Sequence, residues 1–240
     1  MNRKLASLAL AFLFLVTPAS AWSLKEAHTQ ANTTLVQVGD WCSGTIIDKK
    51  QGLIVTAAHC TEPAKVTDNI IIIRPNGDGR TLTHTYFKPI EVTVWNFDDE
   101  GNVTGSQKYM TNVLKAVYPQ DVAILQSLSP SKFSGQAIIG LVPVKYGDKV
   151  FSVGNPLMQV GTVAEGYVTK PRMPFTSSYG LVVTIMHTSF TAPGSSGGGL
   201  FNDFGMLVGI TNWGVAGGPS LASPVSNVLE LLKSLELTVG

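Results

Sequence analysis

The sequence predicts an all-β fold, built from barrels or a sandwich and followed by one terminal helix. Short runs rich in β-branched residues recur along the chain, and clusters of Gly, Pro, Asn and Asp separate them. Many short strands at this spacing are typical of barrels or a sandwich rather than of a parallel sheet. We expect strands over residues 33–38, 44–47, 53–56, 69–74, 90–95, 122–125, 149–153, 181–186 and 207–212.

The expected strands fall into two groups. A stretch rich in Ser, Pro and Lys, residues 127–135, lies between two β-rich halves and is predicted to connect them. The first unit is therefore predicted to cover residues 22–128, and the second residues 129–224. Within the first unit, the segment from Pro75 to Lys108 is either a regulatory loop or an extended hairpin.

The end of the chain has a different periodicity. Over residues 225–236, apolar side chains recur at helical spacing, at Val228, Leu231, Leu232 and Leu235. Ser223-Pro224 comes directly before this pattern, as is common at a helix start. Residues 225–240 are therefore predicted to be a helix and tail, with the apolar face packed on the second half.

The first 21 residues have the layout of a secretory signal peptide. A basic start, Met1–Lys4, is followed by an uncharged apolar run from Leu5 to Val16, and Ala19-Ser20-Ala21 matches a cleavage site. The mature chain would then begin at Trp22. The alternative is an uncleaved membrane anchor, but the apolar run is shorter than the roughly 20 residues that a spanning helix needs. We expect a secreted or periplasmic protein, free of the membrane after cleavage.

Charge and histidine spacing exclude several classes of function. The net charge is +1 and no basic cluster stands out, which argues against a nucleic-acid surface. The four histidines are scattered, without the paired spacing of metal ligands, so neither a metal nor a cofactor is expected. Cys42 and Cys60 are the only cysteines. In an exported protein they either form a disulfide or remain as buried free thiols.

A serine among glycines is the first candidate for chemistry. Residues 191–200 read TAPGSSGGGL, with Pro193 before the glycines and β-type segments close on both sides. Glycines permit unusual backbone angles and allow a substrate carbonyl to approach closely. The backbone amides of Gly194 and Ser196 could then stabilise an oxyanion. The alternative is a flexible Gly/Ser loop without chemical function.

A serine nucleophile needs a base, and His59 fits best among the four histidines. It follows an apolar strand and a turn of small residues and precedes Cys60, so its imidazole is expected to be held rigidly. His28 lies among polar residues and is predicted to be solvated. His84 alternates with threonines, as on the exposed face of a strand. His187, nine residues before Ser196, is either a rival base or a half-buried strand histidine.

An imidazole base in turn needs a carboxylate that orients it. Asp121 directly precedes the apolar residues 122–125, where an unpaired buried charge would be costly, so a partner is expected. The alternative is an ordinary turn aspartate at a strand start. Asp78, Asp98 and Asp99 lie in turns and are predicted to be solvated.

Together these segments resemble the trypsin-like (chymotrypsin-fold) serine protease superfamily. The resemblance rests on four blocks that follow the family's order of His, Asp and Ser: Trp41–Ile47, Thr56–Cys60, Asp121–Leu125 and Gly194–Gly198. It implies two six-stranded antiparallel β-barrels with the active site in the cleft between them. The first barrel would carry His59 and Asp121, and the second would carry Ser196.

The same resemblance assigns roles to individual residues. Ser196 would attack, His59 would transfer the proton, and Asp121 would hold the imidazole in the right tautomer. Gly194 and Ser196 would supply the oxyanion-hole amides, and Cys42 and Cys60 would form the disulfide that braces the histidine loop. The substrate-binding residues would be Phe190, Thr191, Asn212, Trp213 and Gly214.

The chain also departs from the digestive members of this family. Ser195 stands where they have an aspartate, and no Ile-Val-Gly-Gly start is present, so the resemblance implies a bacterial-type member without zymogen activation. None of the predicted pocket residues is acidic. A preference for Arg or Lys is therefore not expected, and a small or medium apolar side chain is. A threonine at position 191 resembles the pocket of glutamate-specific relatives. Those relatives have a histidine just before the tryptophan, however, and this chain has Asn212 there.

The function predicted from the sequence is a secreted serine endopeptidase that works through an acyl-enzyme intermediate. Its partners would be polypeptide substrates, and the protein would be a monomer. The alternative is a catalytically silent trypsin-like homologue that binds a peptide or protein in the same cleft. No member of the predicted triad is missing, which favours the enzyme.

Overall fold

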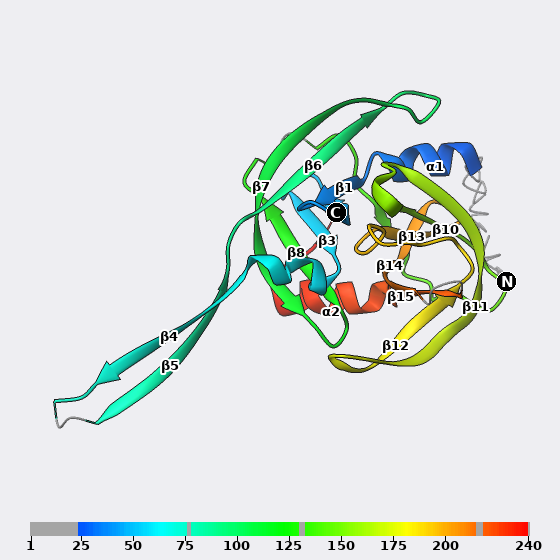
Figure 1. Cartoon of the computed structure of the whole chain (residues 1–240). Coiled ribbons are helices and arrows are strands. Elements are labelled where there is room, and N and C mark those ends of the chain that lie inside the picture. Colours follow the sequence, from blue (N-terminus) through cyan, green and yellow to red (C-terminus); the bar gives the residue numbers. More distant parts are fainter. Residues whose placement is uncertain (1–23, 76–77, 130–132, 215–217, 240) are drawn as a thin grey trace, which may run out of the picture.

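A computed structural model describes residues 24–75, 78–129, 133–214 and 218–239 of the chain (Figure 1). The predicted signal peptide lies outside these residues. The first half contains one α-helix, eight strands and a short 3₁₀ helix. In chain order they are α1 Leu24–Asn32, β1 Leu35–Val38, β2 Cys42–Asp48, β3 Leu53–Thr56, η1 Ala58–Ala64, β4 Lys65–Ile73, β5 Gly79–Phe87, β6 Ile90–Phe97, β7 Val103–Val117 and β8 Val122–Ser127.

The described residues of the second half form seven further strands, a 3₁₀ turn and the terminal helix. They are β9 Ile138–Ile139, β10 Lys149–Gly154, η3 Pro156–Met158, β11 Thr162–Ser177, β12 Gly180–His187, β13 Gly199–Asn202, β14 Met206–Gly214, β15 Ser220–Pro224 and α2 Val225–Ser234.

Each half forms its own barrel. In the first half, six strands close in the order β1-β2-β3-β8-β7-β6. In the second half, β13-β10-β11-β12-β15-β14 form a ring that the pairing of β13 with β14 closes, and all of these pairs are antiparallel. The short β9 adds a seventh strand, parallel to β14, which the sequence did not predict. The prediction of an all-β, chymotrypsin-like fold with a C-terminal helix is confirmed.

Apolar side chains fill both barrels and the space between them. β2 and β3 are buried along their whole length, so they read as continuous apolar or small-residue runs. One buried cluster lies inside the first barrel and includes Ile46, Ile54 and Leu125. A larger cluster joins residues of both barrels and both α-helices, Phe151 and Phe201 among them. Each such side chain contributes roughly 1.5–3 kcal/mol by its burial, so this shared core fixes the two barrels against each other.

The two α-helices differ in how well the sequence predicts them. Helix α2 begins at Val225, and its buried face contains Val228, Leu231 and Leu232, as expected. It packs on β14 and β15 of the second barrel, as expected, and it also packs on β8 of the first barrel, a contact that the sequence did not predict. Helix α1 was not predicted, because only small residues of its described part, Ala27 and Ala31, enter the core.

One pair of strands belongs to neither barrel. β4 and β5 pair only with each other among the described strands and form a two-stranded sheet. Figure 1 shows this hairpin extending away from the two barrels. The segment from Pro75 to Lys108 therefore contains β5, β6 and the start of β7. The segment thus consists mainly of strands from two hairpins, β4–β5 and β6–β7.

Candidate active site

The ends of two paired strands bring His59 and Asp121 together. β3 and β8 are antiparallel neighbours, with Thr56 opposite Ala123, so the residues after β3 lie beside those before β8. His59 Nδ1 lies 2.8 Å from Asp121 Oδ2, and the His59 backbone amide donates to Asp121 Oδ1 at 2.9 Å. Asp121 is completely buried. Both of its carboxylate oxygens are therefore used to hold the histidine.

A disulfide fixes the segment that carries His59. Cys42, at the start of β2, is bonded to Cys60 in η1, with Cα atoms 6.0 Å apart. The expected pairing of the two cysteines is thus confirmed, and free thiols are excluded. A ring nitrogen of His59 and the two sulfurs all lie within 4.8 Å of one another. Because both sulfurs are oxidised, they cannot act as thiolate ligands, and this group does not make a metal site.

Ser196 lies on the loop between β12 and β13, next to the histidine segment. Its carbonyl accepts a hydrogen bond from the Ser43 amide at 2.8 Å, and the Cys60 sulfur lies 3.7 Å from the same oxygen. The Ser196 hydroxyl is partly exposed and donates to the carbonyl of Asn212 at 3.3 Å, rather than to His59. Ser195 is buried instead, and its hydroxyl accepts a hydrogen bond from the Ala192 amide at 3.2 Å.

Three consecutive carbonyls fix the backbone around Ser196. The Pro193 carbonyl accepts from Leu157 N at 2.7 Å, the Gly194 carbonyl from the Ser43 hydroxyl at 2.7 Å, and the Ser195 carbonyl from Gly198 N at 2.9 Å. In a trans peptide the N–H points away from the C=O. The amides of Gly194 and Ser196 are therefore turned away from these contacts, and neither donates a hydrogen bond to any residue that the structure describes.

Asn212, near the end of β14, connects Asp121 with Ser196. Its side-chain Nδ2 donates to the backbone carbonyl of Asp121, while its own backbone carbonyl accepts from the Ser196 hydroxyl. Asn212 is itself buried. The sequence placed Asn212 only in the substrate pocket, so this link between the two barrels was missed.

A hollow of about 880 Å³ lies beside Ser196. All five predicted substrate-binding residues line it: Phe190, Thr191, Asn212, Trp213 and Gly214. The Thr191 hydroxyl lies 2.7 Å from the hydroxyl of Ser220, which donates to the Ser189 carbonyl, so hydroxyl groups form part of the wall. None of the described lining residues is acidic or basic.

Trp41 is a further lining residue to which the sequence gave no role. Its ring centroid lies 6.1 Å from that of His59, and its side chain is 44% exposed. It belongs to the turn just before Cys42 and is the first residue of the first block of the resemblance, Trp41–Ile47, which is the one signal that could have drawn attention to it. Trp41 therefore gives the hollow an aromatic side chain close to the histidine.

The other three histidines lie apart from this arrangement. His84 is exposed on β5, as predicted. His28 is not simply solvated, because its ring packs edge-on against Phe151 with centroids 4.5 Å apart and Nε2 is 3.6 Å from Glu165. Partial burial lowers the pKa of His28. His187 is fully buried in β12, and neither of its ring nitrogens has a hydrogen-bond partner among the described residues.

The burial of His187 decides between its two interpretations. Desolvation lowers its pKa to about 4, so the ring is neutral at physiological pH. A ring with no contact to Ser196 or to an orienting carboxylate does not make a base. The strand-histidine interpretation holds, although the residue is fully rather than half buried.

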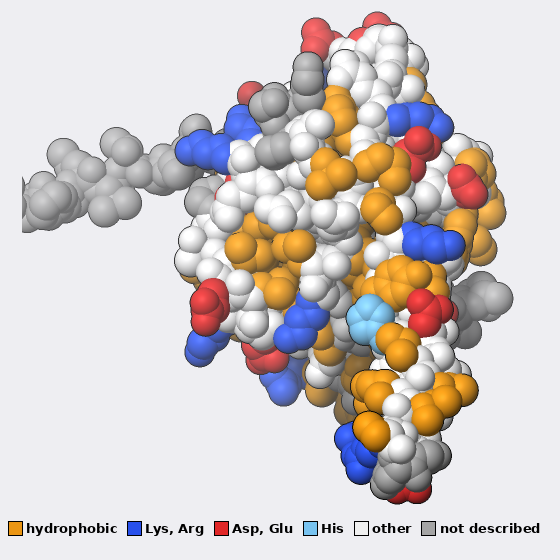
Figure 2. Space-filling model, turned by 90° about the vertical axis from the view of Figure 1, so that its left-hand side faces the viewer, with side chains coloured by type: hydrophobic (Ala, Val, Ile, Leu, Met, Phe, Trp, Pro, Cys, Tyr) orange, Lys and Arg blue, Asp and Glu red, His pale blue; other side chains and the backbone are white. Residues whose placement is uncertain are grey.

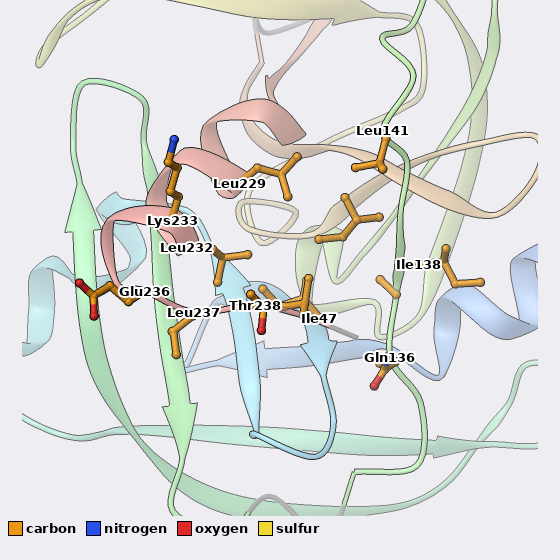
Figure 3. Close-up of a pocket in the computed structure, with 13 residues that line it drawn as sticks. Ile47, Gln136, Ile138, Leu141, Leu229, Leu232, Lys233, Glu236, Leu237 and Thr238 are labelled. Atoms are coloured by element: carbon orange, nitrogen blue, oxygen red, sulfur yellow. The ribbon is translucent and has the colours of Figure 1, made fainter.

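A second hollow, of about 640 Å³, lies where the end of the chain packs against residues 136–141, the segment that contains β9 (Figure 3). Its walls are mostly apolar and come from β2, this segment, α2 and the tail. Figure 3 shows Leu232, Leu237 and Ile47 on one side and Ile138 and Leu141 on the other. Its 13 lining residues include no Ser, His, Cys or Asp. This hollow therefore cannot hold the serine, histidine and aspartate expected of the active site.

Comparison with known proteins identifies the family. A sequence profile of the trypsin-like peptidase domain matches residues 42–210, a range that contains His59, Asp121 and Ser196. The chain belongs to this trypsin-like peptidase family. A search of curated protein sequences found no match.

Solved structures support the same fold. The protease domain of MamO from Magnetospirillum magneticum (apo form) is similar with a TM-score of 0.64 and 19% identity, over 85% of this chain and 97% of that one. A serine endoprotease from Yersinia pestis is similar with a TM-score of 0.62 and 19% identity, over 89% of this chain. The match spans 66% of the length of that endoprotease chain.

Among the described residues, neither helix is a candidate for crossing a membrane. Both α1 and α2 lack the length and continuous apolar character that a crossing requires.

Proposed function

We propose that the protein is a secreted serine endopeptidase, with Ser196 as nucleophile, His59 as general base and Asp121 as the residue that orients the base. The observation that carries the proposal is the 2.8 Å contact between His59 Nδ1 and the fully buried Asp121, beside a serine flanked by two unengaged amides. A family match over residues 42–210 supports it.

The proposed chemistry follows from which atoms are engaged. With its Nδ1–H donated to Asp121 Oδ2, the neutral ring of His59 has its basic lone pair on Nε2. When a peptide binds, the Ser196 hydroxyl would leave the Asn212 carbonyl and give its proton to Nε2 as Oγ attacks the scissile carbonyl. His59 would then protonate the leaving amine, and water would hydrolyse the acyl-enzyme.

The developing oxyanion would be held by the amides of Gly194 and Ser196. Neither amide has a hydrogen-bond partner among the described residues. The carbonyls of Pro193, Gly194 and Ser195 accept hydrogen bonds from other segments or, for Ser195, from Gly198 of the same loop. Donors that are already oriented need no reorganisation during the reaction, and each contributes about 10²–10³ to kcat. This arrangement supports an enzyme that needs no zymogen cleavage, with the buried Ser195 completing the turn.

The wall of the pocket supports the expectation that Arg and Lys are poor P1 residues. A cationic side chain would find hydroxyls of Thr191 and Ser220 but no carboxylate among the described lining residues. Small or medium apolar side chains remain the expected preference. No cofactor enters the proposed reaction.

Export is the proposed route to the site of action. The Cys42–Cys60 disulfide supports an oxidising compartment, either the periplasm or the outside of the cell. N-terminal sequencing of the exported protein tests the proposed signal peptide, and Trp22 is the expected first residue.

A second candidate function is a catalytically silent homologue that binds peptides in the same cleft. The observation in its favour is that the Ser196 hydroxyl is bonded to the Asn212 carbonyl and not to His59. In active serine enzymes the hydrogen bond to the base is often formed only in the substrate complex, so this geometry does not exclude catalysis.

The experiment that decides between the two functions uses a fluorophosphonate probe. The exported protein and its Ser195→Ala variant are expected to become labelled, and the Ser196→Ala variant is not. Profiling the wild type on a peptide library then gives the cleavage preference. Equal labelling of the Ser196→Ala variant would overturn the assignment of the nucleophile. A wild type that is neither labelled nor able to cleave, yet binds library peptides, would establish the silent homologue.

A further inference from the structure

The hairpin of β4 and β5, called the arm from here on, exposes an apolar strand. Four consecutive isoleucines end β4, and Ile71 and Ile73 are 68% and 73% exposed. Figure 2, in which the arm points towards the viewer at the lower right, shows hydrophobic side chains gathered along it. A two-stranded hairpin is marginally stable in water on its own, and three or more strands are needed for independent stability. Among the described strands, the arm therefore has no third strand to stabilise it.

The outer edge of β4 has backbone groups available for such a strand. At one end of the hairpin the Arg74 amide donates to the Asp78 carbonyl at 2.9 Å, and at the other end the Lys88 amide donates to the Ala64 carbonyl at 2.8 Å. The even-numbered residues of β4 therefore direct their backbone N–H and C=O groups towards β5. Successive residues of a strand turn their backbone groups to opposite edges. Ile71 and Ile73 therefore present theirs at the free edge of the arm.

We propose that this edge pairs with the β4 edge of a second copy of the chain, antiparallel and centred on Ile71. A two-fold axis perpendicular to the sheet places the same face of both copies on the same side. An even-numbered residue of one copy therefore lies opposite an even-numbered residue of the other, and an odd-numbered residue opposite an odd-numbered one. Centring on Ile71 places Ile70 opposite Ile72, and Asp68 opposite Arg74, each pair occurring twice. All four side chains lie on one face of the sheet. The result is a four-stranded sheet with an apolar centre and an ion pair at each end.

Neighbouring registers lack this complementarity. Centring on Ile70 places Asp68 opposite Ile72, and centring on Ile72 leaves Arg74 opposite Ile70. Both arrangements place a charge against an isoleucine and leave it without the opposite charge. The Ile71 register thus satisfies the charges and the apolar run together.

The outer edge of β5 fits a second copy less well. β5 contains no acidic residue, and a two-fold pairing centred on Leu82 would bring Arg80 opposite His84. Its remaining outward positions are mostly threonines, in contrast to the isoleucines of β4. The charge pattern therefore selects the β4 edge.

The paired segment is short, which sets the expected strength. Residues 68–74 span about 20 Å of strand, so the interface lies at the small end of specific complexes. A reversible dimer with a dissociation constant on the order of 10–100 µM is expected. The proposed dimer differs from the monomer expected from the sequence.

Sedimentation of the exported full-length protein over a range of concentrations tests the proposal. The wild type is expected to sediment as a monomer–dimer equilibrium. Asp68→Arg alone and Arg74→Asp alone are each expected to raise the dissociation constant at least about tenfold, because two like-charge contacts replace two ion pairs. The double variant Asp68→Arg/Arg74→Asp is expected to restore the dimer.

Mixing the two single variants gives the sharpest readout. One then carries two arginines at these positions and the other two aspartates, so every arginine again faces an aspartate, and a heterodimer is expected. Glu100→Arg, the same kind of charge change in the exposed β6–β7 turn, is the matched control and should dimerise like the wild type. All variants should keep the circular dichroism spectrum of the wild type.

Three results would overturn the proposal. One is a wild type that stays monomeric at about 100 µM, the upper end of the affinity expected for so small an interface. Another is single variants that dimerise as well as the wild type, which would place any interface elsewhere. The third is a mixture of the two singles, or a double variant, that fails to recover the dimer although its fold is intact.

Discussion

The hydroxyl of Ser43 donates a hydrogen bond to the carbonyl of Gly194 at 2.7 Å, although 151 positions separate them in sequence. The same hydroxyl oxygen accepts a hydrogen bond from the Asn155 amide at 2.9 Å. Ser43 is fully buried and belongs to β2 of the first barrel, whereas Gly194 belongs to the serine loop of the second. One hydroxyl of the first barrel thus orients the peptide that lies between the two proposed oxyanion donors.

Replacing Ser43 by Ala should therefore lower kcat more than it changes KM. Without the hydroxyl the Gly194 carbonyl loses its partner, and the neighbouring amides lose part of their orientation. We expect a fall in kcat of roughly tenfold, less than the 10²–10³ that follows removal of an oxyanion donor itself. Steady-state kinetics on the best library peptide measure it. A thermal melt shows whether the variant is folded at the assay temperature, and an unchanged kcat in a folded variant contradicts the role given to Ser43.

A second substitution tests the link through Asn212. Asn212→Ala removes the hydrogen bond to the Asp121 carbonyl while it keeps the backbone carbonyl that accepts from Ser196. Asp121 should then hold His59 less firmly, and kcat should fall about tenfold, at a cost in stability of roughly 1–3 kcal/mol. Asn202→Ala is the control, because among the described residues its side chain accepts hydrogen bonds from the backbone amides of Phe204 and Met206 in its own turn. Equal kinetics for the two variants would contradict a special role for Asn212.

Much of the site can be predicted from short segments of the sequence. His59, Asp121 and Ser196 each stand at the end of an apolar strand or in a glycine turn, where local pattern and the family resemblance agree. Ser43 and the Asn212 link could not be predicted in this way. Their roles depend on contacts between the two barrels, and no local pattern indicates which strands of separate barrels will face each other.

The fold shows the same division between local and distant information. Strands buried on both faces, such as β3 and β8, were found because their apolar runs are continuous. The long strands β7 and β11 were missed, because many of their side chains are exposed and polar, which weakens the pattern. The parallel β9 has only two residues and is defined by its pairing with β14. Such an element exists only through its tertiary partner.

The buried His187 should make stability depend on pH. Its folded-state pKa of about 4 lies below the ordinary value of 6.5, so between these values the unfolded chain binds a proton that the folded chain does not. The free energy of unfolding should then be constant above pH 7 with respect to this group, and fall as the pH drops from 6.5 to 4. The loss should total roughly 3 kcal/mol. Urea denaturation at a series of pH values measures it.

The variant His187→Leu separates this residue from the carboxylates that also titrate in acid. An apolar side chain of similar size removes the two unpartnered ring nitrogens, so the variant should lose less stability than the wild type between pH 6.5 and 4. His28→Leu is the comparison, because His28 is only partly buried and should contribute less in the same direction. Parallel stability curves for wild type and His187→Leu would show that His187 does not titrate as described.

Two glycines with the same backbone preference allow steric and conformational costs to be distinguished. Gly197 and Gly39 both have positive φ, 86° and 57°, so alanine is strained at either position. A Cβ at Gly39 meets nothing within 4 Å, whereas at Gly197 it would overlap the Ser43 carbonyl and the Thr56 hydroxyl. Gly39→Ala should therefore cost about 1–2 kcal/mol of stability.

Gly197→Ala should cost about 1–3 kcal/mol more than Gly39→Ala, since the overlap forces the backbone to move. The displaced segment is the one that follows Ser196 and donates from Gly197 N to Thr211 O at 2.7 Å. We therefore expect Gly197→Ala to abolish labelling of Ser196 by the fluorophosphonate probe, while Gly39→Ala remains labelled like the wild type. Urea denaturation and probe labelling of the two variants side by side measure both effects. Equal losses of stability with intact labelling in both would mean that the loop moves freely away from Ser43, against the tight packing seen between the two barrels.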